Sequence, residues 1–352
     1  MASKSTNIQW LDTLRALATL GVIVIHISSP LVNMTYGRNL NYWWIGNVVD
    51  SAVRFAVPLF LMLSGATLLG KNYTLSEYYR RRFMRVLVPF LFWMVVYWVY
   101  RWLTLKTSQQ PHNFEAIIQW AGKLFLKEGI SKHFWYIYMI LFIYLFVPFL
   151  GKWLQKLNLS ALSNLLLLWA VLSFVLKSIP LNMYNWSGDY ASRLLGYCLL
   201  SGYLVLGYYL SRLPKPSAKV RISAALVFVI SIAISAGSTY FFSQKIHKLD
   251  LSMYSYLSTN TIIQSIALFL WVKDVEFKNK IVTTIQNTLS NYSYGIYLVH
   301  IMIIGILFQK GIYWKFTHPL LSLPLLTVFV VACSFLIIFV LRKIPGGKYI
   351  SG

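Results

Sequence analysis

Long apolar runs alternate with short polar segments along almost the whole chain. A helix needs about 20 mostly apolar residues to cross a bilayer, and each run is about that long. We predict ten spanning helices, at residues 9–30, 44–69, 83–104, 133–151, 161–179, 190–211, 220–243, 253–272, 288–309 and 319–341. This pattern indicates an all-α polytopic membrane protein with one integral-membrane domain over residues 1–352. The loops are short, the longest being 105–132, and no internal repeat is visible.

The composition excludes a soluble protein. Of the 352 residues, 58% are hydrophobic and 12% are charged, about half the charged fraction of a soluble domain. The net charge of +23 raises the question of nucleic acid. We expect no nucleic-acid partner, because the basic residues lie in short loops between apolar runs and are typical of topology signals. Membrane lipid headgroups or an anionic ligand are the secondary use for them. The two cysteines, Cys198 and Cys333, are too few for a thiolate metal site.

The distribution of Lys and Arg predicts the orientation of the chain. About eighteen of these residues fall on one side of the predicted helices and about ten on the other. Cytoplasmic loops carry the excess of positive charge. With an even number of spans, both termini are therefore expected in the cytoplasm.

Three ionisable residues interrupt the first run, QWLDTLRALATLGVIVIHISSP. Asp12, Arg15 and His26 fall on one helix face, with Arg15 and His26 separated by about 16 Å along the axis. Ionisable groups at such positions are costly and indicate function. The alternative is a charge pair that reaches the membrane surface, together with a structural histidine bonded to a neighbouring helix.

The second run carries a buried cation in RFAVPLFLMLSG. Arg54 needs an acceptor, and Asp50, one turn earlier, is the nearest candidate. Pro58 is expected to kink the helix, while Ser64 and Gly65 are small enough to allow close helix approach. A kinked packing helix would also explain this segment.

An arginine cluster precedes the third run in EYYRRRFMRVLVP. Arg82 and Arg85 share a helix face, and Arg81 lies close to it. The cluster fits an ordinary topology signal. Arginine forks also suit phosphate, so an anion site at the membrane surface is the second interpretation.

The fourth run begins with KHFWYIY, which places His133, Trp135 and Tyr136 at the outer interface. An aromatic belt explains the tryptophan and tyrosine there, but not the histidine. Arg193, near the outer start of the sixth run, either lines a pocket or extends to the membrane surface.

The ninth run, LSNYSYGIYLVHIMI, contains a second histidine within apolar sequence. Ser293, Tyr297 and His300 are spaced four and three residues apart and therefore share one helix face. Such a polar stripe lines either a helix contact or a cavity.

Taken in order, these motifs resemble the acyltransferase-three family of integral-membrane O-acyltransferases, which modify bacterial cell-envelope and capsular glycans. The matching pieces are Arg15 and His26, VPLFLMLSG, the Arg82–Arg85 cluster, HFWYI and SYGIYLVH. The likeness is to single-domain members that O-acetylate polysaccharide repeat units. It implies a multi-pass protein of the bacterial inner membrane, with acetyl-CoA or another acyl-CoA as cytoplasmic donor and an envelope glycan or lipid-linked saccharide as acceptor.

The resemblance also implies residue roles. His26 would be catalytic with Arg15 beside it, and Asp12 would hold Arg15 or orient a more distant group. Arg82 and Arg85 would bind CoA, and we place Arg81 and Ser64 with them. The expected supporting residues near the substrate are His133, Trp135, Tyr136, Tyr297, His300 and Arg54. No metal is expected, and a homo-oligomer is compatible with the sequence.

The expected mechanism has His26 as general base for a glycan hydroxyl that attacks the thioester. An acyl-histidine intermediate is the variant, and Tyr136, Tyr297 or a serine are candidate oxyanion donors. The sequence offers no acidic partner for His26. The competing class is a transporter or flippase for a lipid-linked glycan. Missing mid-depth acidic residues and the lack of a visible repeat disfavour it. A purely structural subunit leaves Arg15, Arg54 and His26 unexplained.

Overall fold

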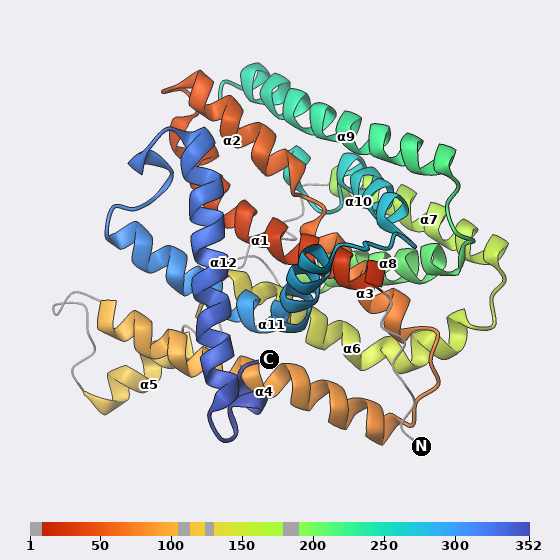
Figure 1. Ribbon diagram of the computed structural model, residues 1–352, viewed down its shortest axis with the longest axis horizontal. Coiled ribbons are helices and arrows are strands. Elements are labelled where there is room, and N and C mark those ends of the chain that lie inside the picture. The colour runs from red at the N-terminus through yellow and green to blue at the C-terminus, as the bar shows by residue number, and fades with distance from the viewer. Residues whose placement is uncertain (1–8, 105–112, 124–129, 179–189) are drawn as a thin grey trace.

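The computed structural model describes residues 9–104, 113–123, 130–178 and 190–352. These residues form helices joined by turns and loops, with no strand among them. The helices are α1 Gln9–Thr35, α2 Leu40–Ala52, α3 Ala56–Leu68, α4 Leu75–Thr104, α5 Phe114–Lys123, α6 Trp135–Leu154, α7 Leu159–Ser178, α8 Tyr190–Arg212, α9 Ala218–Lys245, α10 Thr259–Val272, α11 Lys280–Gln309, α12 Pro319–Lys343 and α13 Gly347–Ile350. Figure 1 shows their arrangement. The predicted all-α fold is confirmed.

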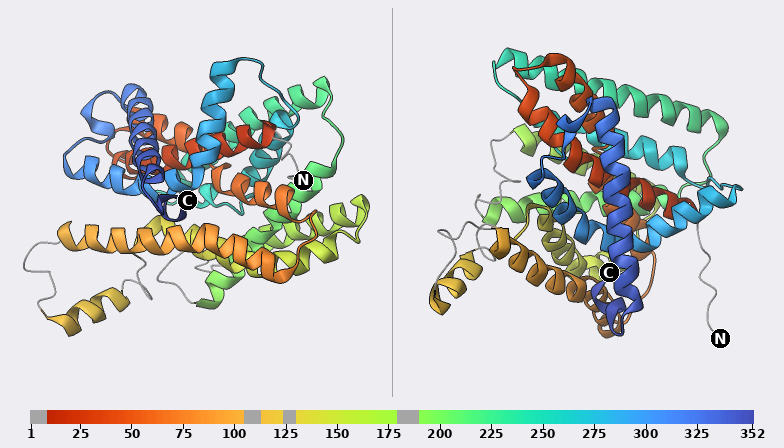
Figure 2. Two further views of the ribbon diagram at one scale, coloured as in Figure 1. Left: turned by 60° about the horizontal axis from the view of Figure 1, so that its bottom comes forward. Right: turned by 60° about the vertical axis from the view of Figure 1, so that its left-hand side comes forward.

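Nine segments of the described chain are long and apolar enough to cross a membrane, with α2 and α3 together making one of them. They correspond to nine of the ten predicted runs. The run predicted at 253–272 instead forms the 14-residue helix α10 after a short 3₁₀ turn, Ser252–Tyr254. At 1.5 Å per residue α10 extends about 21 Å, less than the hydrocarbon core of a bilayer. The predicted loop 105–132 contains α5, which stands apart from the other helices in both views of Figure 2; the rest of that loop falls partly outside the described residues.

Helix α1 lies in the interior and contacts α2, α3, α11 and α12. Its beginning is fixed to the start of α11, where the Gln286 side chain donates to the Gln9 carbonyl at 2.8 Å. The end of α12 lies beside the same part of α11, because Arg342 donates to the Asn291 carbonyl at 3.0 Å. The start of the first spanning helix and the end of the last one therefore lie on the same side of the bundle.

The second span is a broken helix. Residues 53–55 form a turn between α2 and α3, in which the Ala56 amide donates to the Val53 carbonyl. Pro58 lies in the first turn of α3, where a missing N–H costs nothing. The predicted kink is thus a break that lies N-terminal to the proline. Irregular backbone within a spanning segment is tolerated where protein surrounds it or where it lines a cavity.

Arg54 lies in this break and pairs with Asp50, as predicted. Asp50 is fully buried and the Arg54 side chain is 11% exposed. The Arg54 guanidinium also lies over the Tyr254 ring, 4.1 Å from its centroid. The broken span therefore holds a cation at a fixed place inside the bundle.

Glycines allow α3 and α8 to pack backbone against backbone. A Cβ atom added to Gly207 would lie 2.0 Å from the Met62 carbonyl oxygen, and one added to Gly65 would lie 1.9 Å from the Leu204 carbonyl oxygen. Close approach at Gly65 confirms the prediction made from small residues in the second run. This contact fixes α3, which carries several of the site residues.

We expect Gly207→Ala to destabilise the protein by about 1–3 kcal/mol, the range for overpacking a tight contact. The added methyl group collides with a carbonyl oxygen of α3, which cannot move aside without shifting that helix. Gly237→Ala in α9 is the matched control, because its added Cβ meets nothing within 4 Å. Thermal unfolding of the purified protein measures both changes. Equal midpoints for the two variants would contradict the close α3–α8 contact.

Helices α7 and α9 provide the lipid-facing exterior. In the most apolar stretch of each helix, only 17% of the residues of α7 and 22% of those of α9 are buried, compared with 56% for α1. Helix α9 follows one edge of the bundle in Figure 1 and exposes residues such as Ile222, Leu226 and Val229. The chemistry-bearing residues therefore belong to the interior helices.

Candidate functional site

A cavity lined by three arginines opens among α1, α3, α4, α6 and α11. Its volume is about 290 Å³. We call it the arginine cavity, and its polar and charged lining side chains are Arg15, Ser64, Thr67, Arg82, Arg85, Tyr136, Tyr144, Ser290, Asn291, Ser293, Tyr294 and Tyr297. No Asp or Glu belongs to the described lining residues, so the lining carries positive charge.

Arg15 is held in this cavity by residues from two helices. Its Nη1 donates to Ser290 Oγ at 2.8 Å and lies 3.2 Å from Asp12 Oδ1. The Ser290 hydroxyl donates in turn to the same Asp12 oxygen at 2.5 Å. Asp12 thus orients Arg15, one of the two roles the sequence left open. The triangle also joins α1 to α11 at the cavity wall.

The arginine cluster on α4 divides between two surfaces. Arg82 and Arg85 line the cavity, while Arg81 pairs with Glu77 at 2.6 Å and is 77% exposed. Arg81 therefore does not share the site into which the sequence analysis placed it. Tyr73, in the loop before α4, is near Arg82. Burial raises the pKa of the Tyr73 phenol and the charge of Arg82 opposes the rise, so the hydroxyl stays a donor at neutral pH.

Aromatic side chains form the deep end of the arginine cavity. Tyr136 and Tyr297 both line it, with ring centroids 5.6 Å apart. The Tyr297 hydroxyl donates to the backbone carbonyl of His133. Ser64 also reaches the lining, where its hydroxyl lies 3.2 Å from the Tyr144 hydroxyl. The lining of the cavity therefore includes exposed and half-buried arginines as well as buried phenol rings.

Three histidines from three different helical segments gather behind that wall. The His300 ring lies 5.3 Å from the His26 ring and 5.3 Å from the His133 ring, centroid to centroid. The centroid of the Tyr297 ring lies 5.6 Å from that of His300 and 5.4 Å from that of His133. His133 is 2% exposed, so it belongs to the interior and not to the outer interface where the sequence pattern placed it. We call His26, His133 and His300 the histidine cluster.

The hydrogen bonds of the cluster determine one proton position. His300 Nδ1 lies 2.6 Å from the Tyr297 carbonyl oxygen, which can only accept, so Nδ1 carries the proton. His133 Nδ1 lies 2.7 Å from the Ser131 hydroxyl. In the described part of the chain no group of His, Cys, Asp or Glu side chains is arranged to hold a metal ion. The two Nδ1 contacts fix the orientation of the His300 and His133 rings.

His26 lies at the far end of the cluster from the arginine cavity. It lines a separate space of about 20 Å³ with Pro30 and Trp314, and it does not line the arginine cavity. Its nearest ring neighbour is His300, and the positive charge of Arg54 also acts on it. No carboxylate among the described residues forms an ion pair with His26. Tyr297 lines the arginine cavity and contacts His300, which contacts His26, so these two rings link the cavity to His26.

A second cavity, of about 570 Å³, lies beyond the cluster. We call it the second cavity; its lining residues are Ser29, Arg54, Trp135, Arg193, Gly196, Tyr197, Leu200, Leu251, Ser252, Tyr254, Ser255 and Tyr256. It shares no lining residue with the arginine cavity. Two neighbouring residues of α6 line different cavities: Trp135 lines the second cavity, and Tyr136 lines the arginine cavity. On α1, Arg15 lines one cavity and Ser29 the other, with His26 between them.

Sequence reasoning found most of these residues but not all. Ser293, Tyr297 and His300 form a stripe as predicted, with Ser293 and Tyr297 on the arginine cavity and His300 in the histidine cluster. Ser290 was not predicted, although it lies three residues before Ser293 and continues the same stripe. Tyr144 and Tyr256 were also not predicted, because their apolar surroundings give no signal. Arg193 lines the second cavity, which decides between the two interpretations left open for it.

The described residues form a polytopic membrane protein with two cavities near a cluster of three histidines. A family model described as an acyltransferase domain matches residues 8–341, nearly the whole chain. The protein belongs to this acyltransferase family, and the resemblance found in the sequence motifs is confirmed. No curated protein and no solved structure matches the chain. The protein is thus a multi-pass membrane acyltransferase.

Proposed function

We propose that the protein is an O-acyltransferase of the bacterial inner membrane. It moves an acetyl or other short acyl group from cytoplasmic acyl-CoA to a hydroxyl of an envelope glycan. The observation that carries the proposal is the position of the arginine cavity, whose deep end adjoins the histidine cluster. This position supports the proposal that a polyanionic thioester binds next to the group that activates a hydroxyl.

The arginine cavity suits the thin end of CoA. Its volume of about 290 Å³ lies near the lower end of the range of about 300–1,000 Å³ that is usual for small-molecule sites, which suits part of a pantetheine arm better than a whole CoA molecule. The nucleotide phosphates would stay at the mouth, where Arg85 is exposed and Arg82 is half-buried. Guanidinium groups bind phosphate oxygens through paired, charge-assisted hydrogen bonds. The donor therefore enters with its phosphates at the arginines and its acyl group at the phenol wall.

Transfer then requires a base and an oxyanion donor. An imidazole of the cluster, His26 in our assignment, accepts the proton of the acceptor hydroxyl while that oxygen attacks the thioester carbonyl. The C–S bond breaks, and the proton passes to the CoA thiolate, leaving an ester and free CoA. The Tyr297 hydroxyl already donates to His133, which makes Tyr136 the better candidate to stabilise the oxyanion. An acyl-histidine intermediate is the variant with the same net reaction.

The arrangement also demands a conformational step. His26 does not line the arginine cavity and is linked to it through Tyr297 and His300, so in this proposal these side chains rotate for the thioester to meet a hydroxyl activated at His26. While these side chains stay in place, they separate a thioester bound in the arginine cavity from the acceptor side, which limits its hydrolysis.

We expect Arg82→Gln to raise KM for acetyl-CoA about 10- to 100-fold, because a hydrogen bond to a charged group contributes about 1.5–3 kcal/mol. Arg81→Gln is the matched control: the neighbouring arginine is exposed, pairs with Glu77 and lies outside the cavity. Initial rates of CoA release over a range of acetyl-CoA concentrations, with purified protein in nanodiscs, measure both. Equal KM values for the two variants would rule out the arginine cavity as the donor site.

A further inference from the structure

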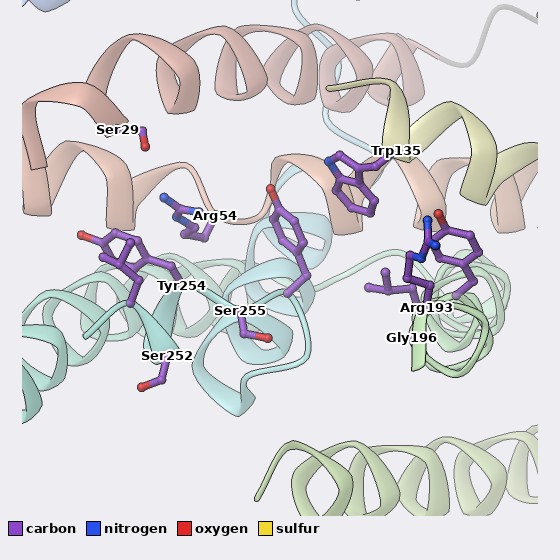
Figure 3. A pocket seen from close by; sticks show the side chains of 12 residues that line it. Ser29, Arg54, Trp135, Arg193, Gly196, Ser252, Tyr254 and Ser255 are labelled. Carbon is purple, nitrogen blue, oxygen red and sulfur yellow. The ribbon is translucent and has the colours of Figure 1, made fainter. Parts of the chain in front are cut away.

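The second cavity has an arginine at each end and aromatic rings between them. Figure 3 shows Arg54 beside Tyr254 at one end and Arg193 near Trp135 at the other. Its volume of about 570 Å³ falls within the range of about 300–1,000 Å³ that is usual for small-molecule sites. The lining is mostly apolar surface with a few polar groups, the composition of a binding site that orients its ligand.

Aromatic side chains offer a flat surface in this cavity. The Trp135 and Tyr256 rings are stacked, with centroids 5.8 Å apart and planes at 20°. The Tyr256 carbonyl accepts from the Tyr203 hydroxyl at 2.5 Å, which fixes this residue to α8. The C–H faces of a pyranose ring are apolar and pack on such flat aromatic rings, while its hydroxyls meet the polar tips. Burial raises the pKa of Tyr254 and of Tyr256, so both phenols stay neutral donors.

The charges in the cavity are positive. Arg54 and Arg193 belong to its lining, and no Asp or Glu does among the described residues. Asp50 is paired with Arg54 behind the wall, and Asp250 accepts from the Ser252 amide at 2.6 Å. Although Asp50 balances the charge of Arg54, the buried Nε of that guanidinium has no acceptor in the described part of the chain. An anionic group on a ligand would supply the acceptor that this N–H lacks.

The second cavity also adjoins the proposed base. Ser29 and His26 are three residues apart on α1, and Arg54 acts electrostatically on the His26 ring. A hydroxyl of a ligand at the Arg54 end would therefore lie on the side of the histidine cluster opposite to the donor.

We infer that the second cavity is the acceptor site and that it selects an acidic saccharide. A sugar ring packs on Trp135 and Tyr256, and a carboxylate or phosphate on the saccharide binds the guanidinium groups of Arg54 and Arg193. The inference rests on the proposed function in one respect, namely that the bound saccharide is the acyl acceptor. The binding of an acidic saccharide can be measured by itself.

The test uses the full chain in nanodiscs, with saccharide binding measured by calorimetry and saturation-transfer NMR. The probes are methyl glucuronide, glucose 1-phosphate and the neutral methyl glucoside. We expect at least one acidic probe to bind about tenfold more tightly than the neutral one, as one added charge-assisted hydrogen bond predicts. Preference for the carboxylate or for the phosphate identifies the source of the negative charge. Equal binding of all three probes, or of none, would overturn the inference.

Variants of the cavity locate the binding. Arg193→Gln should lower the affinity for the acidic probe about tenfold and leave the neutral probe unchanged, whereas Arg193→Lys should restore part of the loss. Trp135→Leu should weaken the binding of both the acidic and the neutral probe. Arg38→Gln is the matched control, an exposed arginine outside the cavity. An unchanged preference in Arg193→Gln with a preserved unfolding midpoint would show that the second cavity is not the site.

Acetyl-CoA binding to the same samples separates this inference from the proposed function. Acidic saccharide binding without any binding or turnover of acetyl-CoA would overturn the acyltransfer from CoA and keep the saccharide site. Turnover of acetyl-CoA without a preference among the saccharide probes would keep the acyl transfer from CoA and overturn the acidic saccharide site.

Discussion

His26→Ala is expected to lower the rate of acyl transfer by about 10²- to 10⁴-fold, the range that a positioned general base contributes. The side chain contacts His300 and lies one helical turn before Ser29 of the second cavity, so its loss removes the imidazole that we assign as the base. It does not line the arginine cavity, and the KM for acetyl-CoA should therefore change little. Release of CoA in the presence of an acceptor glycan, followed over time, measures the rate.

His247→Asn provides the control for this experiment. His247 is an exposed histidine on a turn with φ of 50°, a backbone conformation that asparagine adopts readily. Its replacement should leave transfer and unfolding unchanged. Full activity in a folded His26→Ala protein would remove His26 from its role. If His300→Gln then abolished transfer, the base would be His300, whose Nδ1 is already protonated toward the Tyr297 carbonyl.

Asp50→Leu is expected to destabilise the protein by about 3–5 kcal/mol, because it leaves the Arg54 charge in the interior without its partner. Asp50 is fully buried, and the second cavity gives Arg54 only limited contact with water. Thermal unfolding and unfolding in SDS mixtures of the purified protein measure the effect. Glu77→Gln is the matched control, because it removes the exposed pair with Arg81 and should cost less than about 1 kcal/mol.

The double variant Asp50→Leu with Arg54→Met separates charge from packing. A buried pair replaced by apolar side chains of similar size is often neutral in stability. We therefore expect the double variant to recover most of the loss, while acidic saccharide binding stays weak because a guanidinium of the second cavity is gone. A double variant as unstable as Asp50→Leu would mean that packing around Asp50, and not the stranded charge, causes the loss.

The first of these predictions depends on a histidine cluster that no single apolar run reveals. The spacing of Arg15 and His26 predicted that they share one helix face, and this prediction could be made because both residues belong to one continuous helix, α1. Their environments could not be predicted, because Arg15 is bound by Ser290, which lies 275 residues away in the chain. The same holds for Arg81 and Arg82. They are neighbours in sequence, but only the packing of α4 decides which of them faces the cavity.

The sequence by itself determined that this chain is a multi-pass helical protein, because lipid requires long apolar helices whose backbone groups bond within each segment. It also determined the Asp50–Arg54 pair and the polar stripe of α11, since partners one turn apart follow from helix geometry alone. The tertiary structure alone decided that three histidines meet, that phenol rings separate His26 from the arginines, and that Arg54 and Arg193 face one cavity. These contacts join residues on different helices, whose rotation and tilt are set by side-chain packing and close glycine contacts.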